Sequence, residues 1–177
     1  MSEAGHAGML LPNPVRILMM DCDGVLTDGG MYFDANGQAM KRFDVKDGLA
    51  LSMLAEMGFP TAIVSGDQSD ITAARCKVLK ICHVFLGRMD KEAAVRELLA
   101  ETSIPAEAAV FIGDDITDLP ALRMVGFGVA VADAVEVVRA EADWVTRRPG
   151  GHGAVREVCD AIMAQLAERA EGDQTES

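Results

Sequence analysis

The chain has 177 residues, enough for one domain with a sizeable hydrophobic core. Half of the residues are hydrophobic and a quarter are charged, which is the balance of an ordinary globular protein. The net charge of −12 argues against binding to a nucleic-acid backbone, which requires a basic surface, but it is compatible with a small phosphorylated substrate.

We expect one domain with a flexible segment at each end. We expect residues 1–14 to form a flexible lead, residues 15–168 the domain, and residues 169–177 a flexible polar tail. No signal peptide or membrane-spanning run is visible in the sequence, so we expect a cytoplasmic protein without a membrane partner. The four cysteines lie in or beside apolar runs without metal-ligand spacing, and we expect buried, reduced thiols.

The first strong pattern is an apolar run, Val15–Met20, which contains one arginine and predicts a buried strand of a parallel sheet. Asp21, Asp23 and Gly24 follow it directly. Alternate residues of a strand share a face, so the two carboxylates can point into the same crevice. Adjacent carboxylates repel each other unless a cation or a shared proton relieves them, and Mg²⁺ is a natural partner. A surface turn is the alternative for this motif taken alone.

Two short β-like runs flank Asn36-Gly37 and predict a hairpin at about residues 30–43. A lone hairpin buries too little surface to be stable by itself. We therefore expect this hairpin to pack on a neighbouring subunit; the alternative is a flap over its own protomer.

A helix should follow, with Asp47 as its N-cap. The next apolar run, residues 61–64, predicts a second buried strand that ends at Ser65 and Gly66. Ser65 has two interpretations. Either it caps the next helix, or its hydroxyl and nearby backbone N–H groups receive a phosphate at the end of the strand.

A third strand is predicted at residues 83–86, followed by a helix capped by Asp90. Lys91 falls in the first turn of that helix, where a lysine is unfavourable against the helix dipole. A cation in this place suggests an anion that it meets, the alternative being a solvated surface lysine.

A fourth strand, residues 108–112, runs into three aspartates, Asp114, Asp115 and Asp118, which again require a cation or other compensation. Strands at residues 127–131 and 143–145 complete an alternation of strands and helices. This pattern predicts a three-layer α/β fold with a parallel sheet and with the hairpin inserted after the first strand. The candidate polar residues all fall at the carboxyl ends of strands, where such sheets bind ligands.

The motifs resemble, in order, the four motifs of the haloacid dehalogenase superfamily. The stretch from Asp21 to Asp28, Ser65, Lys91, and Gly113–Asp115 with Asp118 carry this resemblance, which covers roughly residues 15–166. The hairpin, the run Lys41-Arg42-Phe43 ahead of Asp47-Gly48, and the glycine-rich segment Gly150-Gly151-His152-Gly153 are similar to one group within it. That group comprises the small capless phosphatases that act on 3-deoxy-D-manno-octulosonate 8-phosphate (Kdo 8-phosphate).

The resemblance implies a Rossmann-like fold and a Mg²⁺-dependent phosphatase of lipopolysaccharide biosynthesis that hydrolyses a phosphorylated sugar acid. It implies that Asp21 attacks phosphorus and forms an aspartyl phosphate, and that Asp23 acts as acid and then as base. Mg²⁺ would sit on Asp21, the backbone carbonyl of Asp23, and Asp114. Supporting carboxylates would be Asp115 and Asp118, and the phosphate would be held by Ser65, Gly66 and Lys91.

The resemblance also implies a homotetramer in which the hairpins meet and the glycine-rich segment reaches an active site. Asp67 and His152 stand where the resembling enzymes carry arginine, which would alter recognition of a sugar acid. The candidates for substrate contact are Lys41, Asp47, Arg75 and His152. The alternatives to Kdo 8-phosphate are a nonulosonate 9-phosphate, another small phosphometabolite, or a catalytically silent oligomerisation module.

Overall fold

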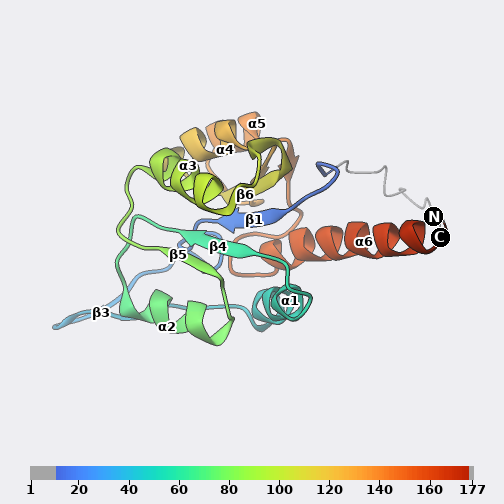
Figure 1. Ribbon diagram of the computed structural model, residues 1–177. Coiled ribbons are helices and arrows are strands. Elements are labelled where there is room, and N and C mark those ends of the chain that lie inside the picture. Colours follow the sequence, from blue (N-terminus) through green and yellow to red (C-terminus); the bar gives the residue numbers. More distant parts are fainter. Residues whose placement is uncertain (1–10, 176–177) are drawn as a thin grey trace, which may run out of the picture.

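A computed structural model describes residues 11–175 of the chain, in which strands and helices alternate (Figure 1). The strands are β1 (Ile17–Met20), β2 (Tyr32–Asp34), β3 (Gly37–Met40), β4 (Thr61–Val64), β5 (His83–Phe85), β6 (Ala109–Gly113), β7 (Phe127–Ala130) and β8 (Trp144–Val145). The helices are α1 (Val45–Glu56), α2 (Asp70–Val78), α3 (Lys91–Thr102), α4 (Leu119–Met124), α5 (Glu136–Glu141) and α6 (Ala154–Thr175). Short 3₁₀ turns, η1 (Ala106–Ala108) and η2 (Ile116–Asp118), flank β6.

In this part of the chain, six strands form one parallel sheet in the order β5-β4-β1-β6-β7-β8. All residues of β1, β4 and β6 are buried, because helices cover both faces of a parallel sheet and their strands are therefore continuously apolar. The chain order reverses at β1, so the carboxyl ends of β1, β4 and β6 lie next to one another. The predicted three-layer α/β fold is confirmed.

The helices form the two outer layers. Figure 1 shows α3, α4 and α5 on one face of the sheet and α1, α2 and α6 on the other. The largest buried side chains, among them Phe111, Leu51, Leu98 and Ile162, fill the space between each layer and the sheet. The core therefore holds the strand ends rigidly at one edge.

Helix starts differ from the sequence prediction at two places. Asp44, not Asp47, is the N-cap of α1, and its carboxylate accepts a hydrogen bond from the backbone N–H of Lys46. Ser69, not Ser65, caps α2, so the helix-cap interpretation of Ser65 is wrong. The prediction that Asp90 caps α3 is confirmed, with Lys91 as the first residue of the helix.

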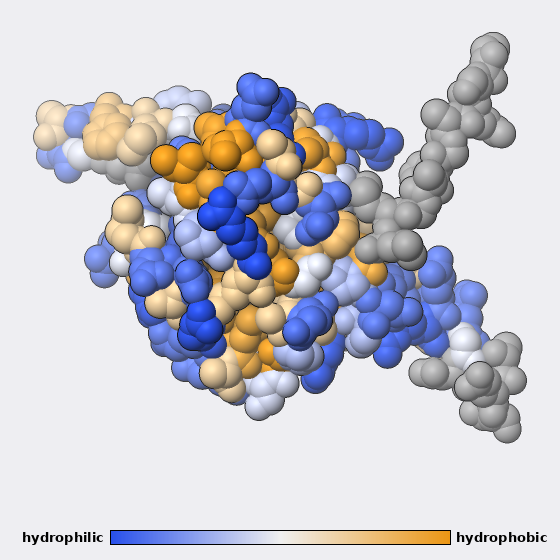
Figure 2. Space-filling model, turned by 90° about the horizontal axis from the view of Figure 1, so that it is seen from above, coloured by the Kyte–Doolittle hydropathy of each residue, from blue (hydrophilic) through white to orange (hydrophobic). Residues whose placement is uncertain are grey.

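The predicted hairpin is confirmed as the antiparallel pair β2–β3, with its turn at Ala35-Asn36. It projects away from the sheet in Figure 1, and its surface in Figure 2 carries apolar residues. Met31, Phe33 and Met40 are each at least 60% exposed. The hairpin is therefore a protruding arm and not a flap packed over its own protomer.

The described structure reaches into both of the segments that we expect to be flexible. Of the predicted lead, residues 1–10 lie outside the described residues. Leu11 is buried, and the side chain of Gln165 donates to the carbonyl of Pro12 and accepts from the N–H of Val15. At the other end, α6 continues to Thr175 through most of the segment for which we expect a flexible tail. Residues 167–172 of this helix are exposed, so the flexibility of the tail stays a prediction.

Three of the four cysteines are buried. Cys22, Cys76 and Cys159 are buried as predicted, whereas Cys82 is exposed, because it follows the turn that enters β5. Within residues 11–175, no helix combines the length and the apolar character that crossing a membrane requires.

Candidate active site

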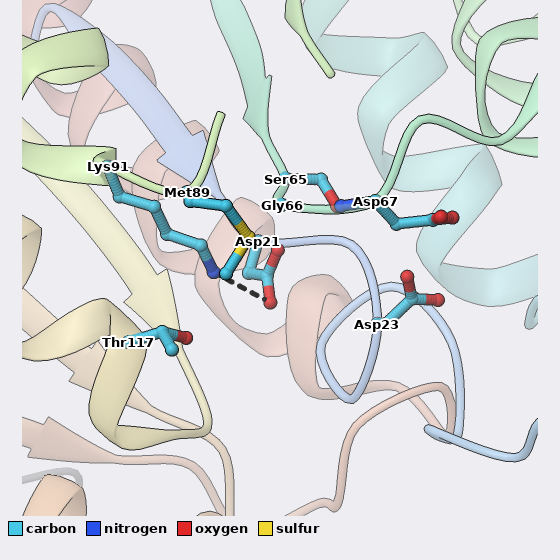
Figure 3. Close-up of a pocket in the computed structure, with 8 residues that line it drawn as sticks. All are labelled: Asp21, Asp23, Ser65, Gly66, Asp67, Met89, Lys91 and Thr117. Atoms are coloured by element: carbon cyan, nitrogen blue, oxygen red, sulfur yellow. Dashed lines mark hydrogen bonds and ion pairs between the residues drawn. The ribbon is translucent and has the colours of Figure 1, made fainter. Parts of the chain in front are cut away.

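A small cavity of about 160 Å³ opens at the shared carboxyl edge of β1, β4 and β6. It is lined by side chains from the ends of β1 and β4, the start of α3 and η2: Asp21, Asp23, Ser65, Gly66, Asp67, Met89, Lys91 and Thr117. Figure 3 shows these side chains converging on one space from four segments that are far apart in the sequence. The structure thus brings together the residues that the sequence suggests for chemistry and for phosphate binding.

Lys91 lies at the centre of a buried ionic cluster. Its Nζ is 3.0 Å from Asp21 Oδ2 and 2.6 Å from Asp118 Oδ1, and its side chain is 4% exposed. Figure 3 shows the contact between Lys91 and Asp21. Burial alone would lower the pKa of Lys91, but the two carboxylates outweigh burial and raise it. Lys91 is therefore a permanent cation beside Asp21, and not a solvated surface lysine.

Asp21 is 7% exposed. Burial and the neighbouring Asp118 raise its pKa to about 6, although Lys91 acts in the opposite direction. Its second oxygen, Oδ1, is buried and has no hydrogen-bond partner among residues 11–175. A buried carboxylate oxygen without a partner is costly, so this atom indicates a missing ligand.

Asp114 has the same unsatisfied chemistry. Its Oδ1 is buried without a partner in the described part of the chain, and burial together with Asp118 and Asp21 raises its pKa to about 8. Carboxylate oxygens of Asp21, Asp114 and Asp118 all lie within 4.8 Å of one another. The two unpartnered oxygens and the oxygen-only donor set fit a hard divalent cation such as Mg²⁺.

Asp118 holds the loop that follows β6 through hydrogen bonds of its carboxylate. Besides its contact with Lys91, its Oδ2 accepts hydrogen bonds from the backbone N–H groups of Asp114 (2.9 Å) and Asp115 (3.2 Å). The Asp115 carboxylate is turned outward and caps η2 by accepting from the N–H of Ile116. Asp118 therefore fixes the loop that carries Asp114, whereas Asp115 shapes the turn.

Gly24 permits the close approach of Asp114 to the end of β1. Its φ is +87°, and a Cβ built on it would lie 2.1 Å from Asp114 Oδ2. The sequence suggests a turn at Gly24 but does not reveal this contact, because the two residues are distant along the chain.

The glycine-rich segment packs against the same loop. A Cβ on Gly150 would lie 1.7 Å from the carbonyl oxygen of Gly24, and the N–H of Gly151 donates to the carbonyl of Val25. This segment is therefore a fixed backbone support of the site and not a free loop before the last helix.

Ser65 stands at the end of β4 and is 2% exposed. Its Oγ accepts a hydrogen bond of 3.2 Å from the N–H of Asp67, which leaves the hydroxyl hydrogen available to the cavity. Gly66 lies under Met89, whose sulfur would be 2.8 Å from a Cβ at that position. A Cβ at this position would require the exposed Met89 side chain to shift.

Asp23 occupies the outer side of the cavity and does not share the ionic cluster of Asp21. Its Oδ2 accepts a hydrogen bond of 2.7 Å from Lys41 Nζ, and its Oδ1 accepts one of 3.3 Å from the hydroxyl of Thr27. Lys41 also binds Asp67, at 2.6 Å. Burial alone would lower the pKa of Lys41, but these two carboxylates raise it. From the sequence we predict Lys41 only as a substrate contact, because residue spacing does not indicate its pairing with Asp23 and Asp67.

The other predicted contacts lie outside the cavity lining. Asp47 is fully buried and accepts hydrogen bonds from two backbone N–H groups near the start of α6, so both of its oxygens are engaged within the chain and its contact with substrate stays a prediction. The Arg75 guanidinium packs over Phe43, with its Cζ 5.4 Å from the centre of the ring. His152 is exposed, and its Nδ1 lies 2.8 Å from the carbonyl oxygen of Gly150.

Comparisons with known proteins agree with this geometry. The sequence profile of the haloacid dehalogenase-like hydrolases matches residues 52–157, which include Ser65, Lys91 and Asp114. The 3-deoxy-D-manno-octulosonate 8-phosphate phosphatase of Escherichia coli K12 is 40% identical over 149 residues, which are 84% of this chain and 79% of that protein.

Two solved structures extend the similarity to the fold. The cobalt-bound deoxy-D-mannose-octulosonate 8-phosphate phosphatase of Haemophilus influenzae has a TM-score of 0.86 and 40% identity, over 89% of this chain and 92% of that chain. The Moraxella catarrhalis 3-deoxy-D-manno-octulosonate 8-phosphate phosphatase, in complex with magnesium, phosphate and KDO, has a TM-score of 0.84 and 37% identity. That match covers 92% of this chain and 94% of the other.

Proposed function

Because this chain belongs to the haloacid dehalogenase-like hydrolase family, we propose that it hydrolyses a phosphorylated sugar acid, with Kdo 8-phosphate as the first candidate. The chain is a phosphatase, a hydrolase of phosphoric monoesters. The observation that carries the proposal is the cavity in which Asp21, Asp23, Ser65 and Lys91 meet. A phosphate bound there would face a carboxylate, a cation and a hydroxyl.

The proposed reaction has two steps. In the first step, a carboxylate oxygen of Asp21 attacks phosphorus while the ester oxygen leaves with a proton from Asp23. In the second step, Asp23 takes a proton from water, and the resulting hydroxide attacks phosphorus and releases inorganic phosphate and Asp21. Two features support these roles: Asp21 is the buried carboxylate at the floor of the cavity, and Asp23 is the half-exposed one at its edge.

We propose that Ser65, Gly66 and Lys91 bind the phosphate. Lys91 Nζ lies 3.0 Å from Asp21, so a phosphoryl group transferred to Asp21 would be within its reach. The Ser65 hydroxyl lies on the opposite side of Asp21 in Figure 3. Phosphoryl transfer depends mainly on such positioning and on charge neutralisation.

Mg²⁺ is the proposed cofactor, held by Asp21, Asp114 and the backbone carbonyl of Asp23, with Asp118 in support. Two oxygens that are buried without a partner among residues 11–175, one on Asp21 and one on Asp114, support this assignment. When bound, the ion neutralises charge on the phosphoryl oxygens. The residues of the chain would then orient the ester and move the protons, as described above.

We also propose that the protein is a homotetramer in which hairpins from different copies meet. The exposed apolar residues on the hairpin, Met31, Tyr32, Phe33 and Met40, support an association of this kind. Since the cavity is small and open, a neighbouring copy would complete the binding site for the sugar. His152, which is exposed beside Gly150, is a candidate for contact with substrate in that assembly.

The position of Asp67 favours a second class of substrate. The Asp67 carboxylate lines the cavity, where it would repel a carboxylate of the substrate. A nonulosonate 9-phosphate or another small phosphometabolite whose hydroxyl groups face Asp67 would avoid this repulsion.

The test is phosphate release from a panel of phosphorylated sugar acids and neutral sugars, with Mg²⁺ and with EDTA. Metal-dependent release that favours Kdo 8-phosphate is the expected result. Preference for a nonulosonate phosphate or a neutral sugar phosphate would replace the proposed substrate. Release from no member of the panel would leave a catalytically silent oligomerisation module as the better description.

A further inference from the structure

The Lys41 ammonium makes three polar contacts at the edge of the cavity. Its Nζ lies 2.7 Å from Asp23 Oδ2, 2.6 Å from Asp67 Oδ2 and 3.0 Å from Thr72 Oγ1. An ammonium has three hydrogens, and these contacts offer an acceptor for each of them. The side chain is 1% exposed, so the cation is enclosed and is not free to swing into solvent.

The acceptors come from separate parts of the fold. Asp23 follows β1, Asp67 belongs to the loop after β4, and Thr72 lies in the first turn of α2. Lys41 itself directly follows the last residue of the hairpin strand β3. The contact set therefore joins the hairpin base to the loops after β1 and β4, two of the segments that line the cavity.

The contacts of Asp23 define its orientation. Lys41 holds Oδ2, and the Thr27 hydroxyl, which also accepts hydrogen bonds from the N–H groups of Gly24 and Gly29, holds Oδ1. With both oxygens engaged, the carboxylate plane is fixed relative to the cavity. A group that must transfer a proton within about 3 Å of its partner gains rate from such a fixed position.

We propose that Lys41 is a positioning residue for the proton transfer by Asp23, and that Asp67 and Thr72 hold Lys41 in place. The proposal rests on the acid–base role of Asp23 in the proposed function. When Asp23 gives its proton to the leaving oxygen, the carboxylate that remains lies against the Lys41 ammonium in a charge-assisted hydrogen bond. Asp67 then has a structural partner in this chain and is not simply a repulsive group at the cavity edge.

A proton donor matters only where the leaving group needs a proton. An alkyl ester, such as a sugar phosphate, leaves as an alcohol, whereas p-nitrophenyl phosphate leaves as a stable nitrophenolate. The quantity to compare is kcat/KM, because it reports the steps up to departure of the leaving group and not the later hydrolysis of the phosphoenzyme. A loss confined to the alkyl ester identifies a defect in proton donation.

The experiment measures kcat/KM for both esters, with Mg²⁺, for the wild type, Lys41→Met, Lys41→Arg and Asp67→Asn. For Lys41→Met we expect a loss of about 10²–10⁴-fold with the alkyl ester and less than about tenfold with p-nitrophenyl phosphate. Lys41→Arg should recover part of the alkyl-ester activity, and Asp67→Asn should show a smaller loss with the same preference. Lys77→Met, which removes an exposed lysine of α2, is the matched control and should change neither value.

The outcomes separate this proposal from the proposed function. Equal losses with both esters, or an increase in KM at unchanged kcat, would overturn the positioning role while the wild type remained a phosphatase. A wild type inactive on both esters would overturn the proposed function and this inference with it. If Lys41→Met fails to fold, the ratio of the two losses in Asp67→Asn decides the question.

Discussion

The carboxylate of Asp47 accepts a hydrogen bond of 2.7 Å from the backbone N–H of Arg156, a residue 109 positions further along the chain. The same carboxylate accepts a bond of 3.1 Å from the N–H of Gly153. An aspartate in the first turn of α1 thus satisfies the free N–H groups at the start of α6. This contact holds the glycine-rich segment against the loop that carries Asp23.

Replacing this buried carboxylate should destabilise the whole domain. Asp47→Ala leaves one buried and one partly buried N–H group without an acceptor, and we expect the free energy of unfolding to fall by about 1–3 kcal/mol. Asp47→Asn keeps an acceptor oxygen and should lose less. Urea unfolding followed by circular dichroism measures both, and an alanine variant as stable as the wild type would contradict the capping role.

Asp21→Asn should remove phosphatase activity, because the amide is a poor nucleophile. We expect kcat to fall by at least about 10³-fold, by analogy with the loss of nucleophiles elsewhere. Asp70→Asn, which changes an exposed aspartate at the start of α2, is the control and should keep full activity. Substantial activity in Asp21→Asn, with its fold intact, would exclude the aspartyl-phosphate mechanism.

The stability of the metal-free protein should fall as the pH rises. Burial and neighbouring carboxylates raise the pKa of Asp114 from 3.8 to about 8, so between these values the folded state binds more protons than the unfolded state. A raised pKa of a carboxyl therefore stabilises the fold at low pH, and this contribution is lost towards pH 8. Since Mg²⁺ binds the ionised form, it should raise the Tm more at pH 8 than at pH 6.

Thermal melts with Mg²⁺ and with EDTA at the two pH values test this prediction, with ionic strength matched by NaCl. Asp114→Asn should stabilise the metal-free protein at pH 8 and should remove most of the effect of Mg²⁺. An effect of Mg²⁺ that is the same at both pH values, or that survives in the variant, would place the ion elsewhere.

Gly24→Ala should damage the metal site more than the fold. Its φ of +87° makes alanine strained, at a cost of about 1–3 kcal/mol, and the new Cβ would meet Asp114 Oδ2. Gly58→Ala is a matched control, since its φ is +72° but nothing lies within 4 Å of the new Cβ. Both variants should lose stability, and only Gly24→Ala should need more Mg²⁺ for half-maximal activity. An equal metal requirement in the two would refute the steric argument.

Phe33→Asp should produce a smaller assembly, because a charge replaces a side chain that is 64% exposed on the hairpin. Light scattering after size-exclusion chromatography gives the mass. Val78→Asp changes an apolar residue of α2 that is 69% exposed and should leave the mass unchanged. A wild type that is already monomeric would refute the proposed tetramer.

Most of the fold could be predicted from the sequence because its signals are local. Apolar runs such as Ile17–Met20 and Ala109–Gly113 identify buried strands. Asn36-Gly37 identifies the hairpin, although the turn itself lies at Ala35-Asn36 and Gly37 already belongs to β3. The helix caps were harder to predict, because Asp44 and Asp47 are both suitable residues and only tertiary contacts decide between them. Asp47 accepts a hydrogen bond from the N–H of Arg156 at the start of α6, a contact that the residues around Asp47 cannot indicate.

Part of the candidate site could likewise be predicted from the sequence, and part could not. The shared strand ends predict that Asp21, Ser65, Lys91 and Asp114 lie near one another, because parallel strands present their carboxyl ends at one edge. The pairing of Lys41 with Asp67 could not be predicted, since it depends on how the hairpin base meets the loop after β4. Long charged side chains choose partners in three dimensions, and sequence spacing does not encode that choice.

The place of β1 between β4 and β6 has a consequence for biosynthesis. A nascent chain that has emerged only as far as α2 can pair β1 with β4, but the other edge of β1 stays unpaired until Ala109–Gly113 is made. During that interval an apolar strand edge is open to other chains, which favours aggregation. Asp21, at the end of the same strand, also lacks Asp114 until then. Completion of β6 therefore pairs the second edge of β1 and brings Asp114 to Asp21 in a single event.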